Sequence, residues 1–407
     1  MKTDFDAVII GAGPAGATAA ILLAQAGWSV ALVEKQVFPR RKVCGECIAA
    51  PNLLLMETLG IAEAFHRLAG PELRQVGLML DNRLVIADLP ALKVGRRAWG
   101  RALGREHLDA LLLQRAAQAG ANILQPWAVR SIAGTAGDFQ CAVAESASGK
   151  SMTLSAPVCI AACGSWEPQS FLPGRNHAHK PGDLFAFKAN FSNSSLRPGL
   201  LPVLAFTGGY GGMVLGDHDT LTLACCIRRD VLQQCRKEYP RRTAAASVEV
   251  YLKASCEGVA HALQHAERQG AWLSVGPIRP GIRVAQTGND LFLIGNAAAE
   301  AHPIIGEGIS MAMQSAWLLS EKLIEQGQDA TAESYRRICG VYIKEWHRNF
   351  ASRVRLAALF AHIAMRPHLG SGALTLLQRW PSMLTYGARL SGKARSLYSR
   401  LWQGEAT

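Results

Sequence analysis

The most constraining stretch of the chain is residues 6–34, where a glycine-rich turn joins a short apolar run to a helical segment. The turn, GAGPAG at residues 11–16, follows the apolar run at 7–10 and opens an alanine-rich segment that ends at Gly27. A second apolar run, residues 29–33, leads to Glu34. This pattern predicts a strand, turn, helix and strand unit of the kind that binds dinucleotides.

Each glycine of the turn has a different structural role in such a unit. Gly11 permits the tight turn, Gly13 lets the backbone approach a pyrophosphate, and Gly16 lets the helix pack closely on the sheet. The helix N-terminus then offers free N–H groups and a positive dipole end to the phosphates. Glu34, at the tip of the second strand, is placed to accept the ribose hydroxyls, and it would repel the 2′-phosphate of NADP.

Length and composition indicate a folded protein with room for two domains. The chain has 407 residues, of which 49% are hydrophobic and 18% charged. No apolar run reaches the roughly 18 residues needed to span a bilayer, and Asp4 and Asp6 stand where a signal peptide would be basic. The ten cysteines are scattered, which favours buried thiols over disulfides. We expect a cytoplasmic protein.

The net charge of +12 is concentrated near the C-terminus. From residue 336 onward the chain has twelve Lys and Arg, against only Glu345 and Glu405. Residues 336–365 are predicted to form a helical cap on the nucleotide domain. Beyond Pro367, aromatic and leucine residues alternate with basic ones, which is typical of an amphipathic segment lying on an anionic membrane. We therefore expect peripheral contact with the inner face of the membrane, and, because no recognition fold is present, no nucleic-acid partner.

The loop after Glu34 carries Cys44-Gly45-Glu46-Cys47, which has three interpretations. It could be a redox dithiol, half of a metal site, or a loop that faces the cofactor. No second CxxC accompanies it, and no second GxGxxG supplies the nicotinamide site that a dithiol reductase needs. We therefore favour the cofactor-facing loop and expect no metal.

The remaining pattern predicts an α/β fold: a Rossmann-type domain with an inserted antiparallel sheet and a C-terminal helical segment. The nucleotide domain is assigned residues 1–72, 97–170 and 285–335, the sheet domain residues 73–96 and 171–284, and the basic helical segment residues 336–407. The predicted strands lie at 121–132, 139–143, 152–160, 184–191, 203–206, 212–215, 221–227 and 291–294, with a further buried parallel strand at 158–162 and a strand pair within 73–94 turning at residues 81–82. Helices are expected at 53–69, from 104, at 245–266 and at 309–323, and the glycines at 208–212 are expected to interrupt the strands.

Three separated segments resemble the three FAD contacts of the single-component flavin monooxygenases typified by p-hydroxybenzoate hydroxylase. They are residues 11–16 with Glu34, Arg105 at a helix start, and residues 295–308. Residues 41–46, RKVCGE, resemble the loop of the geranylgeranyl reductase branch of that superfamily. The overall layout, including residues 161–167 and 208–212, also resembles oxidoreductases found beside bacterial type III polyketide synthases.

The resemblance implies FAD as the cofactor and NAD(P)H as a transient co-substrate. The residues that it assigns to FAD are Gly11, Gly13, Pro14, Ala15, Gly16, Glu34, Lys35, Arg41, Cys44, Gly45, Arg105, Val129, Gly295, Asn296, Gly306, Gly308 and Ile309. Two positions depart from the family pattern, because Asn296 and Cys163 replace the usual aspartates. Asn296 can still hydrogen-bond a ribose hydroxyl, whereas Cys163 lies in the segment linked to NAD(P)H handling.

The activity that this resemblance implies is hydroxylation of an aromatic or polyketide-derived apolar small molecule by reduced FAD and O₂. The flavin carries that chemistry, so the protein must mainly orient, shield and polarise. Cys44, Tyr210, Arg228 and His302 are the candidates for these tasks. A flavin-dependent reductase of isoprenoid or other C=C bonds is the first alternative, and a non-enzymatic flavin-binding redox sensor is the second.

Overall fold

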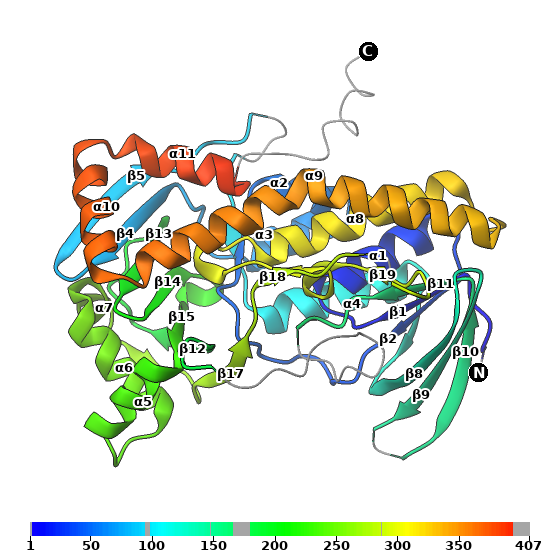
Figure 1. The fold of residues 1–407 in the computed structure, drawn as a ribbon, viewed down its shortest axis with the longest axis horizontal. Coiled ribbons are helices and arrows are strands. Elements are labelled where there is room, and N and C mark those ends of the chain that lie inside the picture. Colours follow the sequence, from blue (N-terminus) through cyan, green and yellow to red (C-terminus); the bar gives the residue numbers. More distant parts are fainter. Residues whose placement is uncertain (1, 94–97, 147, 166–179, 286, 394–407) are drawn as a thin grey trace.

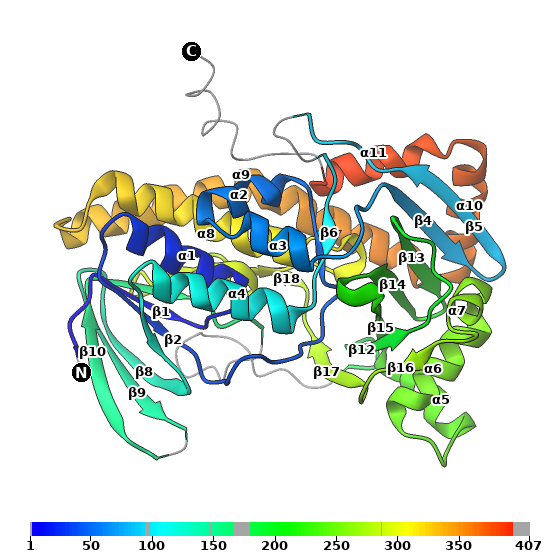
Figure 2. The same cartoon turned by 180° about the vertical axis from the view of Figure 1, so that it is seen from behind.

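The computed structural model describes residues 2–93, 98–146, 148–165, 180–285 and 287–393. A parallel five-stranded sheet lies at one end of the elongated molecule, and a larger sheet lies at the other (Figures 1 and 2). The long helix α9 (Ala332–Ala364) spans both.

The parallel sheet contains the predicted nucleotide unit. Its order is β19 (Phe292–Leu293), β11 (Val158–Ala161), β1 (Ala7–Ile10), β2 (Val30–Val33) and β7 (Asn122–Leu124). Helix α1 (Pro14–Gln25) packs against α4 (Arg105–Gln118) and α8 (Gly308–Gln326). All four residues of β1 and of β2 are buried, as expected for central parallel strands. The predicted strand, turn, helix and strand unit is confirmed.

Prolines interrupt two predicted strands in the structure. The stretch 121–132 forms β7 and β8 (Trp127–Thr135), separated by Pro126, which has no N–H to donate to a ladder. The predicted strand 152–160 ends as β10 (Ser151–Ala156) before Pro157, and the parallel strand predicted at 158–162 is confirmed as β11. Strands β8, β9 (Asp138–Glu145) and β10 form an antiparallel sheet of their own beside the parallel one.

The larger sheet has the order β16 (Glu267–Arg268), β12 (Leu184–Ser192), β15 (Leu221–Arg228), β14 (Gly209–Leu215), β13 (Leu200–Phe206), β4 (Gln75–Leu80) and β5 (Arg83–Asp88), and β17 (Leu273–Ile278) also pairs with β12. It is a mixed sheet rather than the predicted antiparallel one, because β4 joins β13 in parallel. Helices α5 (Arg229–Glu238), α6 (Ala244–Ser255) and α7 (Glu257–Ala262) lie beside it.

The glycines at 208–212 do not interrupt this sheet as predicted. Gly209 to Gly212 form the first half of β14. A Cβ on Gly209 would lie 2.1 Å from the Phe206 ring, and one on Gly211 would lie 2.7 Å from the Ala224 carbonyl oxygen. These glycines are therefore needed for close packing within the sheet.

Short elements connect the two sheets. They are β3 (Cys47–Ile48) with β6 (Arg101–Ala102), β18 (Gly281–Ile282) with β20 (Ala299–Glu300), α2 (Pro51–Leu59), α3 (Ala62–Leu68), η2 (Gly295–Ala297) and η3 (Pro303–Ile305). A further short helix, η1 (Asp217–Asp219), joins β14 to β15 within the larger sheet. The predicted helix at 53–69 is divided into α2 and α3 by Gly60, whose φ is +75°.

The C-terminal helices cover both sheets. Helix α9 packs on α8 through Trp346 and Phe350, and Tyr342 donates a 2.8 Å hydrogen bond to the Leu293 carbonyl in the parallel sheet. Its last turns, with Ala357 and Ala361 buried, lie on the larger sheet. Helices α10 (Pro367–Arg379) and α11 (Ser382–Ser391) cover β4 and β5 (Figure 1). The segment beyond Pro367 is thus packed on one side, and its residues 394–407 lie outside the described structure.

Candidate active site

The glycine-rich turn forms an open cradle at the start of α1. Gly11 has φ +99°, and a Cβ there would lie 2.8 Å from the Ala162 carbonyl oxygen. A Cβ on Gly16 would lie 1.8 Å from the Gly11 carbonyl oxygen. A Cβ on Gly13 would meet only one heavy atom of the described residues within 4 Å, Nη2 of Arg105 at 3.7 Å. The backbone is thus tight at Gly11 and Gly16 and open at Gly13, where a phosphate needs room.

Glu34 is buried at the end of β2. Its Oε2 accepts a 2.9 Å hydrogen bond from the Ala12 amide, and its Oε1 accepts a 2.8 Å bond from the Gln36 amide. These bonds fix the carboxylate at the wall of a cavity of about 190 Å³ that Lys35 and Val129 also line. Among the described residues, the Arg40 Nε in this wall is buried without a hydrogen-bond partner. The carboxylate and the unsatisfied donor fit the ribose and adenine half of FAD.

Arg105 is a fixed cation beside the cradle. Its Nε and Nη2 donate 2.7 Å hydrogen bonds to the two carboxylate oxygens of Asp109 on the next turn of α4. Burial alone would lower the pKa of Arg105, but Asp109 and Cys44 outweigh it and raise that pKa further. The guanidinium therefore keeps its charge where the Gly13 turn would hold a pyrophosphate.

The basic loop 40–42 contributes differently from the prediction. Arg41 lies between the larger sheet and α4. Its Nη1 donates a 3.1 Å hydrogen bond to the Gln269 carbonyl, just after β16, and its Nε lies 3.7 Å from Glu106 of α4. Arg40 and Lys42 line the cofactor cavity instead. Burial, together with the charges of Arg105 and Arg40, lowers the pKa of Lys42 to about 8. The run of three basic residues is the signal for Lys42, but the sequence does not tell which of the three faces inward.

The third predicted segment lies against the same cradle. The Gly295 amide donates a 2.9 Å hydrogen bond to Ser315 Oγ on α8, and a Cβ on Gly295 would lie 2.9 Å from Ala15. Asn296 Nδ2 donates a 3.0 Å hydrogen bond to Ser165 Oγ, beyond the end of β11. Gly306, Gly308 and Ile309 follow at the N-terminus of α8. The structure therefore brings all three predicted segments to the carboxyl edge of the parallel sheet.

A larger cavity, of about 520 Å³, begins at this cradle and extends over the inner face of the larger sheet. Gly13, Pro14, Ala15, Cys44, Gly45, Arg105 and Asn296 line its cradle end. Apolar residues of the sheet and of the C-terminal helices, among them Leu78, Val203, Val275, Phe360, Leu377 and Leu384, line the rest. Gly13, Lys42, Ala162 and Gly164 line both cavities, so the two cavities adjoin at the cradle.

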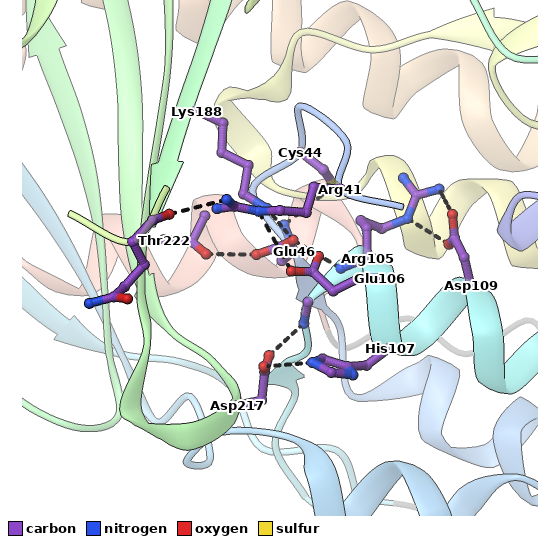
Figure 3. A network of polar contacts seen from close by, with 12 residues as sticks. Arg41, Cys44, Glu46, Arg105, Glu106, His107, Asp109, Lys188, Asp217 and Thr222 are labelled. Atoms are coloured by element: carbon purple, nitrogen blue, oxygen red, sulfur yellow. Dashed lines mark hydrogen bonds and ion pairs between the residues drawn. The ribbon is translucent and has the colours of Figure 1, made fainter. Parts of the chain in front are cut away.

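A buried ion pair attaches the CGEC loop to the larger sheet (Figure 3). Glu46, with φ +56°, pairs with Lys188 of β12 and accepts a 2.6 Å hydrogen bond from Thr222 of β15. The Arg105 amide donates a 2.9 Å bond to the same carboxylate. Sequence reasoning missed Lys188 and Thr222, because nothing in their strands marks them as partners of Glu46. The loop and the start of α4 are thereby held together at the cavity wall.

The four candidate catalytic residues fall in different places. Tyr210 lines the large cavity, and its hydroxyl lies 2.9 Å from Nδ1 of His302. Burial lowers the pKa of His302 to about 4 and raises that of Tyr210, so both are neutral at pH 7. Arg228 pairs with Asp230 at the end of β15 and is not among the residues that line the cavity. Cys44 lines the cavity.

The two cysteines of the CGEC loop are free thiols in the structure. The Cys44 sulfur accepts a 3.3 Å hydrogen bond from the Glu46 amide, which shapes the loop. Cys47 is buried, and burial raises its pKa. Within the described ranges, no group of His, Cys, Asp or Glu is arranged to hold a metal ion.

Comparison with known proteins identifies the nucleotide half of the chain. Residues 4–176 match the FAD binding domain family. Conditioned medium factor receptor 1 of Dictyostelium discoideum is 24% identical to the chain, in an alignment that covers 99% of this chain and 76% of the receptor. A pyrrole-2-carbonyl carrier-protein chlorinase of Pseudomonas fluorescens is also 24% identical, and that alignment covers 92% of this chain and 89% of the chlorinase. A menaquinone reductase of Mycolicibacterium smegmatis is 32% identical, in an alignment that covers 30% of this chain and 29% of the reductase.

Solved structures share the whole fold. The flavin-dependent brominase Bmp2 has a TM-score of 0.77 at 19% identity, with 96% of this chain and 94% of that one covered. PqsL of Pseudomonas aeruginosa, solved with 2-aminobenzoylacetate, has a TM-score of 0.70 at 18% identity, with 91% and 99% covered. A geranylgeranyl bacteriochlorophyll reductase-like protein of Thermoplasma acidophilum has a TM-score of 0.68 at 17% identity, with 95% and 99% covered.

The matched domain and the cradle define a flavoprotein that binds FAD. Residues 4–176 match an FAD binding domain, and the chain shares its fold with PqsL and with the geranylgeranyl bacteriochlorophyll reductase-like protein, which agrees with the resemblance seen in the sequence.

Proposed function

We propose that the protein is a monooxygenase that hydroxylates an aromatic or polyketide-derived apolar substrate, with NAD(P)H as reductant and O₂ as oxidant. The observation that carries the proposal is the large apolar cavity that opens directly from the FAD cradle. A chamber of this kind desolvates a small apolar molecule and holds it against the cofactor. FAD, when bound and reduced, supplies the electrons and activates the oxygen.

The residues of the chain then orient the substrate and exclude water. The apolar side chains of the sheet and of α9 to α11 form the walls. Tyr210 is a polar group in this wall, and its raised pKa keeps a proton on its oxygen. The neutral imidazole of His302 can accept that proton as a hydrogen bond, which fixes the hydroxyl rotor. With its proton donated to His302, the Tyr210 oxygen is left to accept a hydrogen bond from a substrate hydroxyl.

A reductase of C=C bonds is the second candidate. The CGEC loop lines the cavity, and the menaquinone reductase match favours this chemistry. Anaerobic turnover separates the two functions. A hydroxylase stops without O₂ and consumes one O₂ per substrate in air, whereas a reductase continues without O₂. Two similar proteins are a chlorinase and a brominase. Reactions should therefore also be run with chloride and bromide, and the product masses measured by mass spectrometry to detect an incorporated halogen. Failure to oxidise any nicotinamide would support a redox sensor.

We also propose that this cytoplasmic enzyme contacts the inner face of the membrane through α10 and α11. Their outer surface exposes Leu369, Leu376, Trp380, Met383, Tyr386 and Leu390. No acidic residue lies between Glu345 and Glu405 in the sequence, so the charged side chains that α10 and α11 themselves supply, Arg379 and Arg389, are basic. Leu376 and Met383 also line the cavity, which connects this surface to the substrate chamber. Among the described residues, no helix has the length and hydropathy needed to cross a bilayer.

Vesicle co-sedimentation tests the membrane contact. Deleting α10 and α11 would uncover β4 and β5, so point variants are the better probes. We expect salt-sensitive binding to phosphatidylserine vesicles that Trp380→Glu with Tyr386→Glu abolishes. Val37→Glu, which changes an exposed apolar residue of the loop after β2, should bind normally. Absence of binding at low salt, or binding unchanged by the double substitution, would contradict the proposal.

A further inference from the structure

One buried lysine of the C-terminal segment reaches the flavin cavity. Lys393 follows α11, is 8% exposed and lines the large cavity. Its Nζ lies 3.2 Å from Oε1 of Glu307, and 3.4 Å from both the Cys47 sulfur and the Gly306 carbonyl oxygen. Cys47 ends the CGEC loop, and Gly306 and Glu307 precede α8. Lys393 therefore touches two of the segments that surround the cofactor.

Glu307 depends on this lysine for charge compensation. The carboxylate is fully buried, and within the described part of the chain neither of its oxygens accepts a hydrogen bond. A buried carboxylate without a counter-charge is strongly unfavourable. Burial raises the pKa of the Cys47 thiol, which is therefore neutral near pH 7. Burial lowers the pKa of Lys393, but Cys47 and Glu307 outweigh it and raise that pKa above its usual value. Because the Cys47 thiol is neutral near pH 7, Glu307 is the anion that Lys393 neutralises there.

The position of Lys393 is fixed by the fold. The preceding residue, Gly392, has φ +110°, and a Cβ there would lie 2.8 Å from Nη1 of Arg353 on α9. Arg353 Nη1 donates a 2.8 Å hydrogen bond to Gln314 on α8, and Gln314 donates a 2.9 Å bond to Asn52 on α2. A buried polar network therefore supports the turn that delivers the lysine.

We propose that Lys393 is a positioning residue of the flavin site, which neutralises Glu307 at the start of α8 and thereby sets the reduction potential of bound FAD. Gly306, Gly308 and Ile309 line the same cavity as the Gly13 cradle. Reduction adds negative charge to the flavin, and the positive end of α8 favours that charge. An uncompensated Glu307 carboxylate at the same helix end would oppose it. The inference rests on FAD binding alone and holds for either candidate reaction.

The test compares the midpoint potential of bound FAD in four variants by reductive titration against a reference dye. Lys393→Met should weaken binding of reduced relative to oxidised FAD about tenfold, a shift of about 30 mV to more negative potential. Lys393→Arg should stay near the wild type. Glu307→Gln should shift the potential in the positive direction, and adding it to Lys393→Met should restore much of the loss.

Flavin content and the FAD dissociation constant are measured for each variant. If Lys393→Met fails to fold or to retain FAD, Glu307→Gln and the double variant still test the proposal. Unchanged potentials in Glu307→Gln, or a double variant as negative as Lys393→Met, would overturn it. These readouts do not depend on substrate, so failure of the hydroxylation proposal would leave this result intact.

Discussion

The hydroxyl of Thr222 donates a 2.6 Å hydrogen bond to Oε2 of Glu46, linking the larger sheet to the loop that follows the FAD cradle. Lys188 and the Arg105 amide contact the same carboxylate. The side chain is almost completely buried. The Glu46 carboxylate therefore fixes the position of the CGEC loop relative to the larger sheet (Figure 3).

Glu46→Gln should lower the free energy of unfolding by about 3 kcal/mol, because it leaves the Lys188 charge buried without its counter-ion. Urea unfolding monitored by circular dichroism measures this change. Glu72→Gln is the matched control, since it removes a carboxylate from solvent-accessible pairs with Arg74 and Arg101 and should change stability by about 1 kcal/mol or less. Equal effects of the two substitutions would contradict the role assigned to Glu46.

Gly13 and Gly16 should respond differently to substitution. Gly13→Val should leave the apoprotein folded, because space is open at that position, but should weaken FAD binding by about 3 kcal/mol, or about a hundredfold. Gly16→Ala should prevent folding, because its Cβ would overlap the Gly11 carbonyl oxygen. Flavin fluorescence and thermal unfolding of the apoproteins measure both effects. Normal FAD affinity in a folded Gly13→Val variant would exclude this turn as the phosphate site.

FAD affinity should fall as the pH rises through about 8, which is the lowered pKa of Lys42. The cofactor phosphates favour the protonated lysine, so FAD binding takes up a proton above that pH and binding weakens as the charge is lost. Between pH 7 and pH 9 we expect a loss of up to about tenfold. Lys42→Met should bind more weakly at pH 7 and show little pH dependence over this range. A wild-type dissociation constant that is constant from pH 7 to pH 9 would contradict this assignment.

Local patterns predict the nucleotide half well. The turn at 11–16 and the apolar runs beside it specify β1, α1 and β2 through contacts close in sequence. The contacts that build the cavity join distant residues, and no local pattern encodes them. Lys188 and Glu46 are 142 positions apart, and the parallel pairing of β4 with β13 brings together strands separated by more than a hundred residues. Helix α5 is not predicted because its sequence, RDVLQQCRKE, is mostly polar.

The basic C-terminal segment shows the same limit. Its composition predicts a helix lying on a surface, and α10 and α11 do expose apolar side chains. No local feature indicates that the opposite faces of these helices close the substrate cavity, nor that Lys393 pairs with Glu307. Amphipathicity indicates that one face is buried, but the partner of that face depends on tertiary packing.

Cys47→Ser should leave flavin reduction by NAD(P)H nearly unchanged, because we interpret Cys47 as a buried neutral thiol rather than half of a redox dithiol. Mass spectrometry of alkylated protein, before and after reduction, should show no disulfide between Cys44 and Cys47 during turnover. Loss of flavin reduction in Cys47→Ser, together with a disulfide that appears only after oxidation, would restore the dithiol interpretation.

The most direct test of the monooxygenase assignment is the fate of dioxygen. The purified protein, loaded with FAD and supplied with NAD(P)H and an accepted apolar substrate, is allowed to react under isotopically labelled O₂, and the product is weighed by mass spectrometry. We predict one labelled oxygen atom in each product molecule and no turnover under argon. An unlabelled product that gains two hydrogens, formed equally well under argon, would contradict the assignment.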